Sequence, residues 1–365
     1  MNEQGADMAH MARALRLARR GLYTTDPNPR VGCVLVQRGE VVGTGWHERA
    51  GEPHAEIHAL RAAGQSARDA TAYVTLEPCC HHGRTPPCTD ALIGAKVARV
   101  VVAMEDPNPQ VAGGGVALLR EAGITVEVGL LQAQGEALNP GLISRIRRRR
   151  PFVRAKLAAS LDGRTAMPSG ESRWISGDAA RADVQGWRAR SSAIVSGVGT
   201  ILADDPALTV RAFDIGRQPL RVIVDSKLRM PPSAKVLANE GPVLVVTACN
   251  DGDRAEFVRN AGAEVLHLPA DDDSVDLAAL MQHLAGQGIN EVLLEAGEKL
   301  CGAMLQANLI DEFILYLAPT IMGSRARGMF DVPGLERMRD RVALGIEDVR
   351  AIGDDWRFIC RPIRD

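Results

Sequence analysis

The chain has 365 residues, enough for two domains at about 150 residues each. With 46% hydrophobic and 24% charged residues, its composition excludes collagen, coiled coils and disordered tails. A formal net charge of −2 provides no global positive field for nucleic acid or an anionic membrane. The longest apolar runs, 31–36 and 313–318, are far shorter than the roughly 20 residues that cross a bilayer, and arginines interrupt any signal-peptide core in 8–22. We therefore expect a cytoplasmic protein without a membrane partner.

The first half is expected to alternate helices and strands. Apolar residues at spacings of three and four predict an amphipathic helix over 8–22. Pro53 is placed to begin a second helix, and further helical segments are expected after Cys88 and over 116–122. Strands are expected at 31–37, 41–46, 71–76, 99–104 and 124–128, the first two forming a hairpin. This alternation predicts a largely buried sheet with helices on both faces.

The strongest shift in composition is an arginine run at 145 and 147–150, followed by Pro151. We place the domain boundary there, with a first domain over 1–147 and a second over 148–365. The chain is nearly neutral and the run contains no aromatic residues, so a solvated linker is a better interpretation than an RNA-binding segment. The second half predicts another α/β domain, with strands expected at 152–158, 193–196, 220–224, 243–247, 264–268, 292–295 and 313–317.

The cysteines and histidines of the first half suggest a metal site. Seven cysteines, an odd number, disfavour a disulfide framework in a chain without an export signal. His54 stands 25 residues before Cys79, and eight residues separate Cys79 from Cys88. One histidine and two cysteines suit a catalytic zinc, which takes three protein ligands and leaves its fourth position for water. Glu56 is not needed as a ligand and is a candidate to move protons, as in the H-x-E and P-C signature of zinc deaminases.

Other ligand sets stay open at this point. The gap between the two cysteines exceeds one helical turn, so the loop 81–87, restricted by two prolines, must fold back to return Cys88 to the metal. Ala55 stands where a zinc-protease helix requires glutamate, which excludes that motif. A closed structural zinc site, or no metal, is the alternative to an open catalytic site. The rival ligands are Cys80, His58, His81 and His82.

These motifs resemble a known family. His54-Ala55-Glu56, Glu77-Pro78-Cys79 and the string HGRTPPC at 82–88 resemble the deaminase half of the bifunctional riboflavin biosynthesis deaminase/reductases, within the cytidine deaminase-like superfamily. Similar segments at 27–29, 106–109, 160–163 and 203–206 extend the resemblance over essentially the whole chain. It implies a three-layer α/β/α cytidine deaminase-like domain, then a dihydrofolate reductase-like α/β domain that uses NADPH. It also implies a homo-oligomer, a dimer or a tetramer.

The resemblance also implies the site residues. An aminopyrimidine with its ribose phosphate is expected to contact Asn28, His47, Arg84, Asp106 and Asn108 in the first domain. The sugar phosphate is expected to contact Ser172, Arg188, Leu208, Arg211 and Glu295 in the second. The cofactor is expected to contact Ala158, Trp174, Thr200, Asp204, Ser226, Gly297, Glu298, Lys299, Leu300, Cys301, Gly302 and Ala303. Arginine suits phosphate and tryptophan supplies a flat apolar wall. Lys156 and Asp162 are further candidates at the reacting end of this site, with a surface charge and a turn-forming aspartate as the respective alternatives.

The expected function is therefore two consecutive reactions on one small molecule. Zinc and Glu56 would deaminate 2,5-diamino-6-ribosylamino-4(3H)-pyrimidinone 5′-phosphate, and NADPH would then reduce its ribosyl group to ribityl. A nucleic-acid-editing zinc deaminase with an RNA-binding C-terminal domain is the alternative. It predicts a basic groove, which a near-neutral chain with 4% aromatic residues disfavours. A reductase with an inactive first domain is a further possibility.

Overall fold

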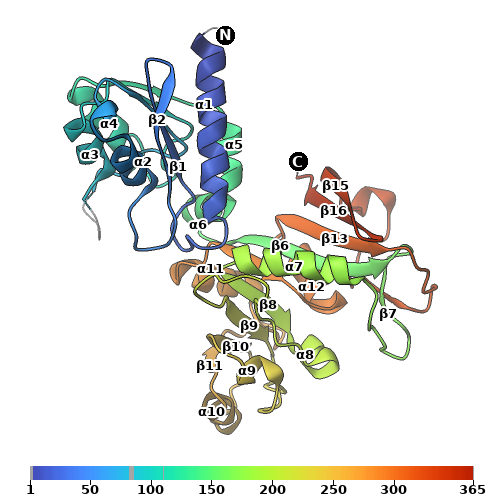
Figure 1. Cartoon of the computed structure of the whole chain (residues 1–365). Coiled ribbons are helices and arrows are strands. Elements are labelled where there is room, and N and C mark those ends of the chain that lie inside the picture. Colours follow the sequence, from blue (N-terminus) through green and yellow to red (C-terminus); the bar gives the residue numbers. More distant parts are fainter. Residues whose placement is uncertain (1–2, 82–85, 110, 365) are drawn as a thin grey trace. The chain divides into compact units, whose positions relative to one another are not determined.

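The computed structural model describes residues 3–81, 86–109 and 111–364 (Figure 1). The chain folds into two compact units, Met1–Arg149 and Arg150–Asp365. Each unit is built around one large sheet, as the alternating pattern predicts. Within the described residues, no helix has both the length and the apolar character that crossing a membrane requires.

The first unit contains every predicted element of that half. The predicted hairpin is confirmed as strands β1 and β2. The predicted first helix is present and ends before this hairpin. In chain order the elements are α1 (Glu3–Ala18), η1 (Arg19–Gly21), β1 (Gly32–Gln37), β2 (Glu40–Trp46), α2 (Ala55–Ala63), η2 (Gly64–Ala67), β3 (Thr71–Val74), α3 (Cys88–Gly94), β4 (Arg99–Val102), α4 (Gly114–Glu121), β5 (Thr125–Val128), α5 (Gln132–Leu138) and α6 (Pro140–Arg148).

The sheet of this unit has the order β2-β1-β3-β4-β5 and is covered on both faces. Strand β1 is antiparallel to β2 and β3, and β3, β4 and β5 are parallel. Because side chains alternate along a strand, Val34 and Val36 pack with Met11 of α1, whereas Cys33 and Leu35 belong to the core cluster beneath α2, α3 and α4. Figure 1 shows α1 and α5 on one side of the sheet and α2, α3 and α4 on the other. The predicted three-layer α/β/α arrangement is confirmed.

The second unit is a larger α/β domain. Its elements are β6 (Phe152–Ser160), β7 (Arg164–Ala166), α7 (Asp178–Arg190), β8 (Ala193–Gly197), α8 (Val198–Asp204), β9 (Leu220–Val224), α9 (Lys235–Ala238), β10 (Val243–Thr247), α10 (Gly252–Asn260), β11 (Glu264–His267), α11 (Leu277–Gly286), β12 (Glu291–Leu294), α12 (Glu298–Gln306), β13 (Glu312–Ala318), β14 (Arg327–Gly328), η3 (Met338–Asp340), β15 (Leu344–Ile352) and β16 (Asp355–Pro362).

Its nine-stranded sheet has the order β11-β10-β9-β8-β12-β6-β13-β16-β15. The strands from β11 to β13 are parallel neighbours, and β16 is antiparallel to β13 and β15. Apolar clusters cover both faces. The sequence did not predict the hairpin of β15 and β16, because most side chains of β15 are exposed and form no apolar run.

In both units, several of the expected site residues come shortly after parallel strands. The backbone N–H of Glu77, after β3, donates to the carbonyl of Met104, after β4 (3.0 Å), so these two segments run side by side. In the second unit, Thr200, Ser226 and Glu295 come shortly after β8, β9 and β12. Ligands in open α/β sheets bind at the carboxyl ends of the strands, so each unit has one edge suited to a site.

Candidate active sites

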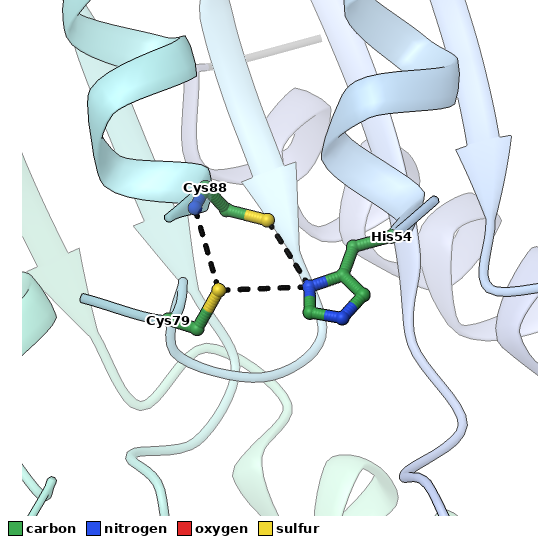
Figure 2. A group of neighbouring side chains, drawn as sticks. All are labelled: His54, Cys79 and Cys88. Atoms are coloured by element: carbon green, nitrogen blue, oxygen red, sulfur yellow. Dashed lines mark hydrogen bonds between the residues drawn. The ribbon is translucent and has the colours of Figure 1, made fainter. Parts of the chain in front are cut away.

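The structure brings the three predicted zinc ligands together in the first unit (Figure 2). His54 is the N-cap of α2, Cys88 is the first residue of α3, and Cys79 lies in the turn after β3. The Nδ1 atom of His54 lies 3.3 Å from the Cys88 sulfur and 3.5 Å from the Cys79 sulfur. One ligand atom from each residue therefore lies within 4.8 Å of the other two.

The chemistry of this cluster fits zinc. A hydrogen bond from the Cys88 thiol lowers the pKa of Cys79 to about 4, and the His54 ring contributes a further hydrogen bond. The same contact with Cys79, together with burial, raises the pKa of Cys88. The backbone N–H of Cys88 also donates to the Cys79 sulfur at 3.3 Å. Zinc in a three-ligand site takes an imidazole nitrogen and two cysteine thiolates, so Cys88 would lose its proton when the metal binds.

The Glu56 carboxyl lies in the first turn of α2 and is 3% exposed. Burial raises its pKa to about 7, because water no longer stabilises the carboxylate. Its own backbone N–H and the neighbouring His54 oppose this rise. A carboxyl group with a pKa near neutrality can both accept and release a proton.

Of the rival ligands, none within the described residues joins a metal-binding group. His54, Cys79 and Cys88 form the one cluster of at least three histidine, cysteine or acidic side chains found there. Cys80 is half-buried, and burial raises its pKa, which disfavours a thiolate. His82 and the expected phosphate partner Arg84 lie outside the described residues. All seven cysteines are free, as expected for a chain without a disulfide framework.

Two of the residues expected to bind the aminopyrimidine contact each other beside the ligand cluster. The Nδ2 of Asn28 lies 3.1 Å from Nε2 of His47. The His47 ring is 2% exposed and stands edge-on to the His54 ring, with centroids 5.3 Å apart. Burial lowers the pKa of His47, which favours the neutral ring. Asn28 and His47 thus lie next to the zinc-ligand cluster.

The other two described residues of this set, Asp106 and Asn108, lie in the loop after β4. The Asp106 carboxylate accepts the backbone N–H of Asn108 at 2.8 Å. Burial raises the pKa of Asp106, and the neighbouring Glu77 adds to this effect. This loop therefore presents a half-buried acid and an amide at the same edge of the sheet as Cys79.

In the second unit, the structure joins two residues expected to contact the sugar phosphate. Arg188 of α7 donates from Nε and Nη2 to the two carboxylate oxygens of Glu295, at 2.6 and 2.9 Å. Its Nη1 also donates to the carbonyl of Thr209 at 3.2 Å. Lys156 lies near this pair, and burial lowers its pKa. These contacts place a guanidinium, a carboxylate and an amine together.

The remaining expected residues of this unit differ in exposure. Ser172 donates to Asp204 at 3.2 Å, and Arg211 is exposed while its backbone N–H donates to Gln185 at 2.8 Å. Trp174 is 71% exposed, with the Arg181 guanidinium 4.4 Å from its ring centroid. The side chains of Leu208 and Cys301 are buried in the core, and so is Gly302. The residues at intermediate exposure are Ala158, Thr200, Ser226, Glu298, Leu300 and Ala303, and Gly297 and Lys299 are exposed.

The start of α12 fits a phosphate-bearing cofactor. Its N-cap is Gly297, and no side chain caps the helix there. The first N–H groups of a helix have no partner within it and, with the helix dipole, favour an anion. An added Cβ at Gly297 would meet no atom within 4 Å, so this end of the helix is open.

The contacts of Asp162 are those of a turn-forming aspartate, which the sequence offered as the alternative to a role at the reacting end. Its carboxylate accepts the backbone N–H groups of Met322 (3.1 Å) and Gly323 (2.8 Å), and also a hydrogen bond from the Ser160 hydroxyl. These hydrogen bonds, the one from Ser160 first, lower the pKa of Asp162 to about 2. Asp162 therefore links the turn after β6 to a loop 160 residues later by hydrogen bonds. A sequence pattern within a short window could not predict this contact.

Two family models match the chain. Residues 5–104 match the "Cytidine and deoxycytidylate deaminase zinc-binding region", and residues 151–358 match the "RibD C-terminal domain". The "Riboflavin biosynthesis protein RibD" of Escherichia coli (strain K12) is 51% identical, with 96% of this chain and 97% of the relative covered. The protein of the same name from Haemophilus influenzae is 47% identical, with 98% and 97% covered.

Solved structures agree with these matches. Acinetobacter baumannii RibD, form 1, has a TM-score of 0.92 and 46% identity, with 99% of this chain and 100% of that chain covered. A Thermotoga maritima protein has a TM-score of 0.87 and 32% identity over 99% of this chain and 100% of its own. It is described as a diaminohydroxyphosphoribosylaminopyrimidine deaminase/5-amino-6-(5-phosphoribosylamino)uracil reductase. The predicted fold class, a cytidine deaminase-like domain followed by a reductase domain of this type, is confirmed.

Proposed function

The chain belongs to the RibD family of riboflavin biosynthesis proteins, and from this membership we propose which residues carry its two activities. It is a bifunctional enzyme with a deaminase domain and a reductase domain. We assign the zinc-dependent deaminase to residues 1–147 and the NADPH-dependent reductase to residues 148–365. The substrate is a small phosphorylated aminopyrimidine, and the protein acts in the cytoplasm as a homo-oligomer.

The first reaction is the hydrolytic deamination of 2,5-diamino-6-ribosylamino-4(3H)-pyrimidinone 5′-phosphate. His54, Cys79 and Cys88 hold zinc, which when bound supplies the Lewis acidity that makes water nucleophilic near neutral pH. Glu56 takes a proton from the attacking water and passes it to the amine that leaves as ammonia. Asn28, His47, Arg84, Asp106 and Asn108 bind and orient the substrate.

The second reaction reduces the ribosyl group to ribityl. NADPH when bound supplies the hydride, and the protein orients the two reactants and excludes water. Arg188 and Arg211 bind the sugar phosphate, with Glu295 holding the Arg188 guanidinium in place. Ser172 and Leu208 complete this set. The start of α12, from Gly297 to Ala303, holds the cofactor together with Ala158, Trp174, Thr200, Asp204 and Ser226.

The observation that carries this proposal is the position of Glu56 beside a three-ligand cluster. Among the described residues, the cluster has three protein ligands and a neighbouring carboxyl with a pKa of about 7, an arrangement that supports a catalytic zinc over a closed structural one. The nucleic-acid-editing alternative is not favoured, because residues 151–358 match a reductase domain of the RibD type.

One assay tests both activities. The purified chain is mixed with the diaminopyrimidinone ribosyl phosphate and NADPH, and ammonia release and NADPH oxidation are recorded with and without prior treatment with a zinc chelator. We expect ammonia first and NADPH oxidation second in the untreated protein. Chelation should abolish ammonia release, whereas NADPH oxidation with already deaminated substrate should persist. Ammonia release that survives complete zinc removal would contradict the proposed mechanism.

A further inference from the structure

Glu77 is a buried acid to which the proposed mechanism gives no role. It lies two residues before the zinc ligand Cys79 and is 4% exposed. Its carboxylate accepts three backbone N–H groups: Oε2 accepts from Asp106 and Gly113, both at 3.0 Å, and Oε1 accepts from Val116 at 3.1 Å. Among the residues that the structure describes, none forms an ion pair with it.

Two of these three contacts cap a helix. Gly113 is the N-cap of α4, and no side chain within the helix caps it. The first N–H groups of a helix require outside acceptors, and a negative charge there is favourable. The Glu77 carboxylate supplies both the acceptor oxygens and the negative charge, from a residue 36 positions before Gly113. These contacts alone would make it a structural residue.

The third contact reaches the proposed substrate site. Asp106 begins the segment that carries two proposed substrate contacts, and its own carboxylate accepts the backbone N–H of Asn108. A continuous series of hydrogen bonds therefore runs from Glu77 through Asp106 to Asn108. The segment of Glu77 also carries Cys79, so one carboxylate ties the zinc-ligand turn to the substrate-contacting loop.

Helix α4 packs directly against the Glu77–Pro78 segment. A Cβ added at Gly115, in the first turn of α4, would lie 2.2 Å from the Pro78 carbonyl oxygen and 3.3 Å from Oε1 of Glu77. The helix thus approaches the Glu77–Pro78 backbone as closely as glycine allows.

We propose that Glu77 is a positioning residue of the deaminase, which holds the substrate-contacting segment 106–108 in register with the zinc-ligand turn and so sets substrate affinity. This inference rests on the proposed function. It separates Glu77 from Glu56, which moves the proton, and from His54, Cys79 and Cys88, which hold the metal.

The test is Glu77→Gln in the full-length, zinc-loaded chain. Glutamine has the same shape but one acceptor oxygen, so at least one of the three backbone N–H groups loses its partner. We expect the KM of deamination to rise on the order of tenfold, the usual effect of leaving a buried donor unsatisfied, while kcat, zinc content and reductase activity stay at the wild-type level. A raised KM with unchanged kcat means lost ground-state binding. Glu121→Gln, exposed at the end of the same helix, is the matched control and should change nothing.

Two results overturn the inference: a wild-type KM in Glu77→Gln, or a loss of zinc or of kcat at unchanged KM. If the glutamine variant fails to fold, Glu77→Asp, which keeps both oxygens on a side chain one methylene shorter, is judged by the same criteria. A wild-type chain that releases no ammonia contradicts the proposed function instead. In that case amide hydrogen exchange decides: faster exchange at Asp106 and Gly113 in the variant supports the positioning role, and unchanged exchange overturns it.

Discussion

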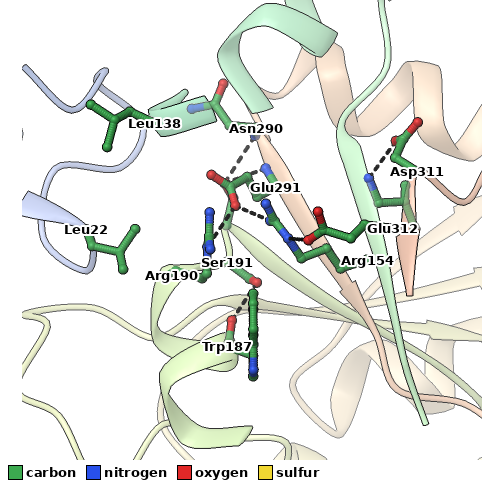
Figure 3. A network of polar contacts seen from close by, with 12 residues as sticks. Leu22, Leu138, Arg154, Trp187, Arg190, Ser191, Asn290, Glu291, Asp311 and Glu312 are labelled. Carbon is green, nitrogen blue, oxygen red and sulfur yellow. Dashed lines mark hydrogen bonds and ion pairs between the residues drawn. The ribbon is translucent and has the colours of Figure 1, made fainter. Parts of the chain in front are cut away.

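The two units differ in how they accommodate buried glutamate side chains. In the first, Glu56 is buried without an arginine partner among the described residues. In the second, Glu291 and Glu312 flank the buried Arg154, which contacts both (Figure 3). Arg190 adds a contact to Glu291 at 3.1 Å, and Arg361 adds one to Glu312 at 3.1 Å.

The pKa values follow from this difference. Burial raises the pKa of Glu56 to about 7. Burial would also raise the pKa of Glu295. The ion pair with the Arg188 guanidinium outweighs the effect of burial, so the pKa of Glu295 lies below its usual value. The same side chain is therefore a proton carrier in one unit and a fixed anion in the other. The presence of a guanidinium, more than the degree of burial, decides which.

The largest expected effect concerns Glu56, the buried acid without an arginine partner among the described residues. Glu56→Gln keeps the shape of the side chain but cannot carry a proton, so ammonia release should fall by about 10²–10⁴-fold, the range of general acid–base catalysis. Reduction of already deaminated substrate should not change, which provides the control within the same chain. Ammonia release within threefold of the wild type would show that another group moves the proton.

The next effect tests the paired acids. Arg154→Met leaves Glu291 and Glu312 without their shared buried partner and should lower the free energy of unfolding of the second unit by about 3 kcal/mol. Urea unfolding followed by reductase activity measures this change. Arg361→Met is the control, because the Arg361 side chain is 47% exposed and such pairs contribute at most about 1 kcal/mol. Equal effects of the two substitutions would refute the idea that the buried guanidinium dominates the network.

The smallest effect sharpens the comparison with a largely buried ion pair in the first unit, between Asp7 and Arg99. Asp7 of α1 accepts two hydrogen bonds from Arg99 of β4, at 3.0 and 2.7 Å, and one from the Tyr73 hydroxyl. The hydrogen bonds from Arg99, ahead of the other effects, lower the pKa of Asp7 below its usual 3.8. The folded state thus favours the ionised form, and its contribution is complete above that value and lost as the pH falls through the lowered pKa.

Asp7→Asn should therefore destabilise the first unit by about 2 kcal/mol at pH 7, because the pair is largely buried and hydrogen bonds to charged groups contribute about 1.5–3 kcal/mol. The difference between wild type and variant should vanish as the pH falls through the lowered pKa of Asp7. Unfolding experiments between pH 7 and pH 2 measure it. A difference that stays constant over this range would mean that packing, and not charge, is responsible.

Much of the fold could be predicted from sequence because the signals are local. The strand at Leu220–Val224 has the bounds expected from its apolar run. The helix expected from Pro53 is present but begins at Ala55, so His54, expected within the helix, is its N-cap. The hairpin of β15 and β16 was missed because most of the β15 side chains are exposed. An exposed edge strand leaves no apolar run to detect.

The partnerships between distant residues could not be predicted. Arg188 and Glu295 were each expected to contact the sugar phosphate. The structure shows that they also form an ion pair with each other, although 107 positions separate them in the chain. Asp162 meets its backbone donors 160 and 161 residues away, and Glu77 meets its own 29 to 39 residues away. A sequence shows which groups could pair, but only the strand order decides which of them meet.

By itself, the sequence determined the alternation of helices and strands, the residue types of a zinc site and the resemblance to one family, since each depends on short spacings or on many matching positions. The tertiary structure decided which histidine nitrogen faces the two sulfurs, which buried acids have a guanidinium partner, and that Glu77 links the zinc-ligand turn to the loop after β4. These features depend on how strands far apart in the chain are brought side by side. Backbone N–H groups, which every residue other than proline carries, acquire their specific partners only at that stage.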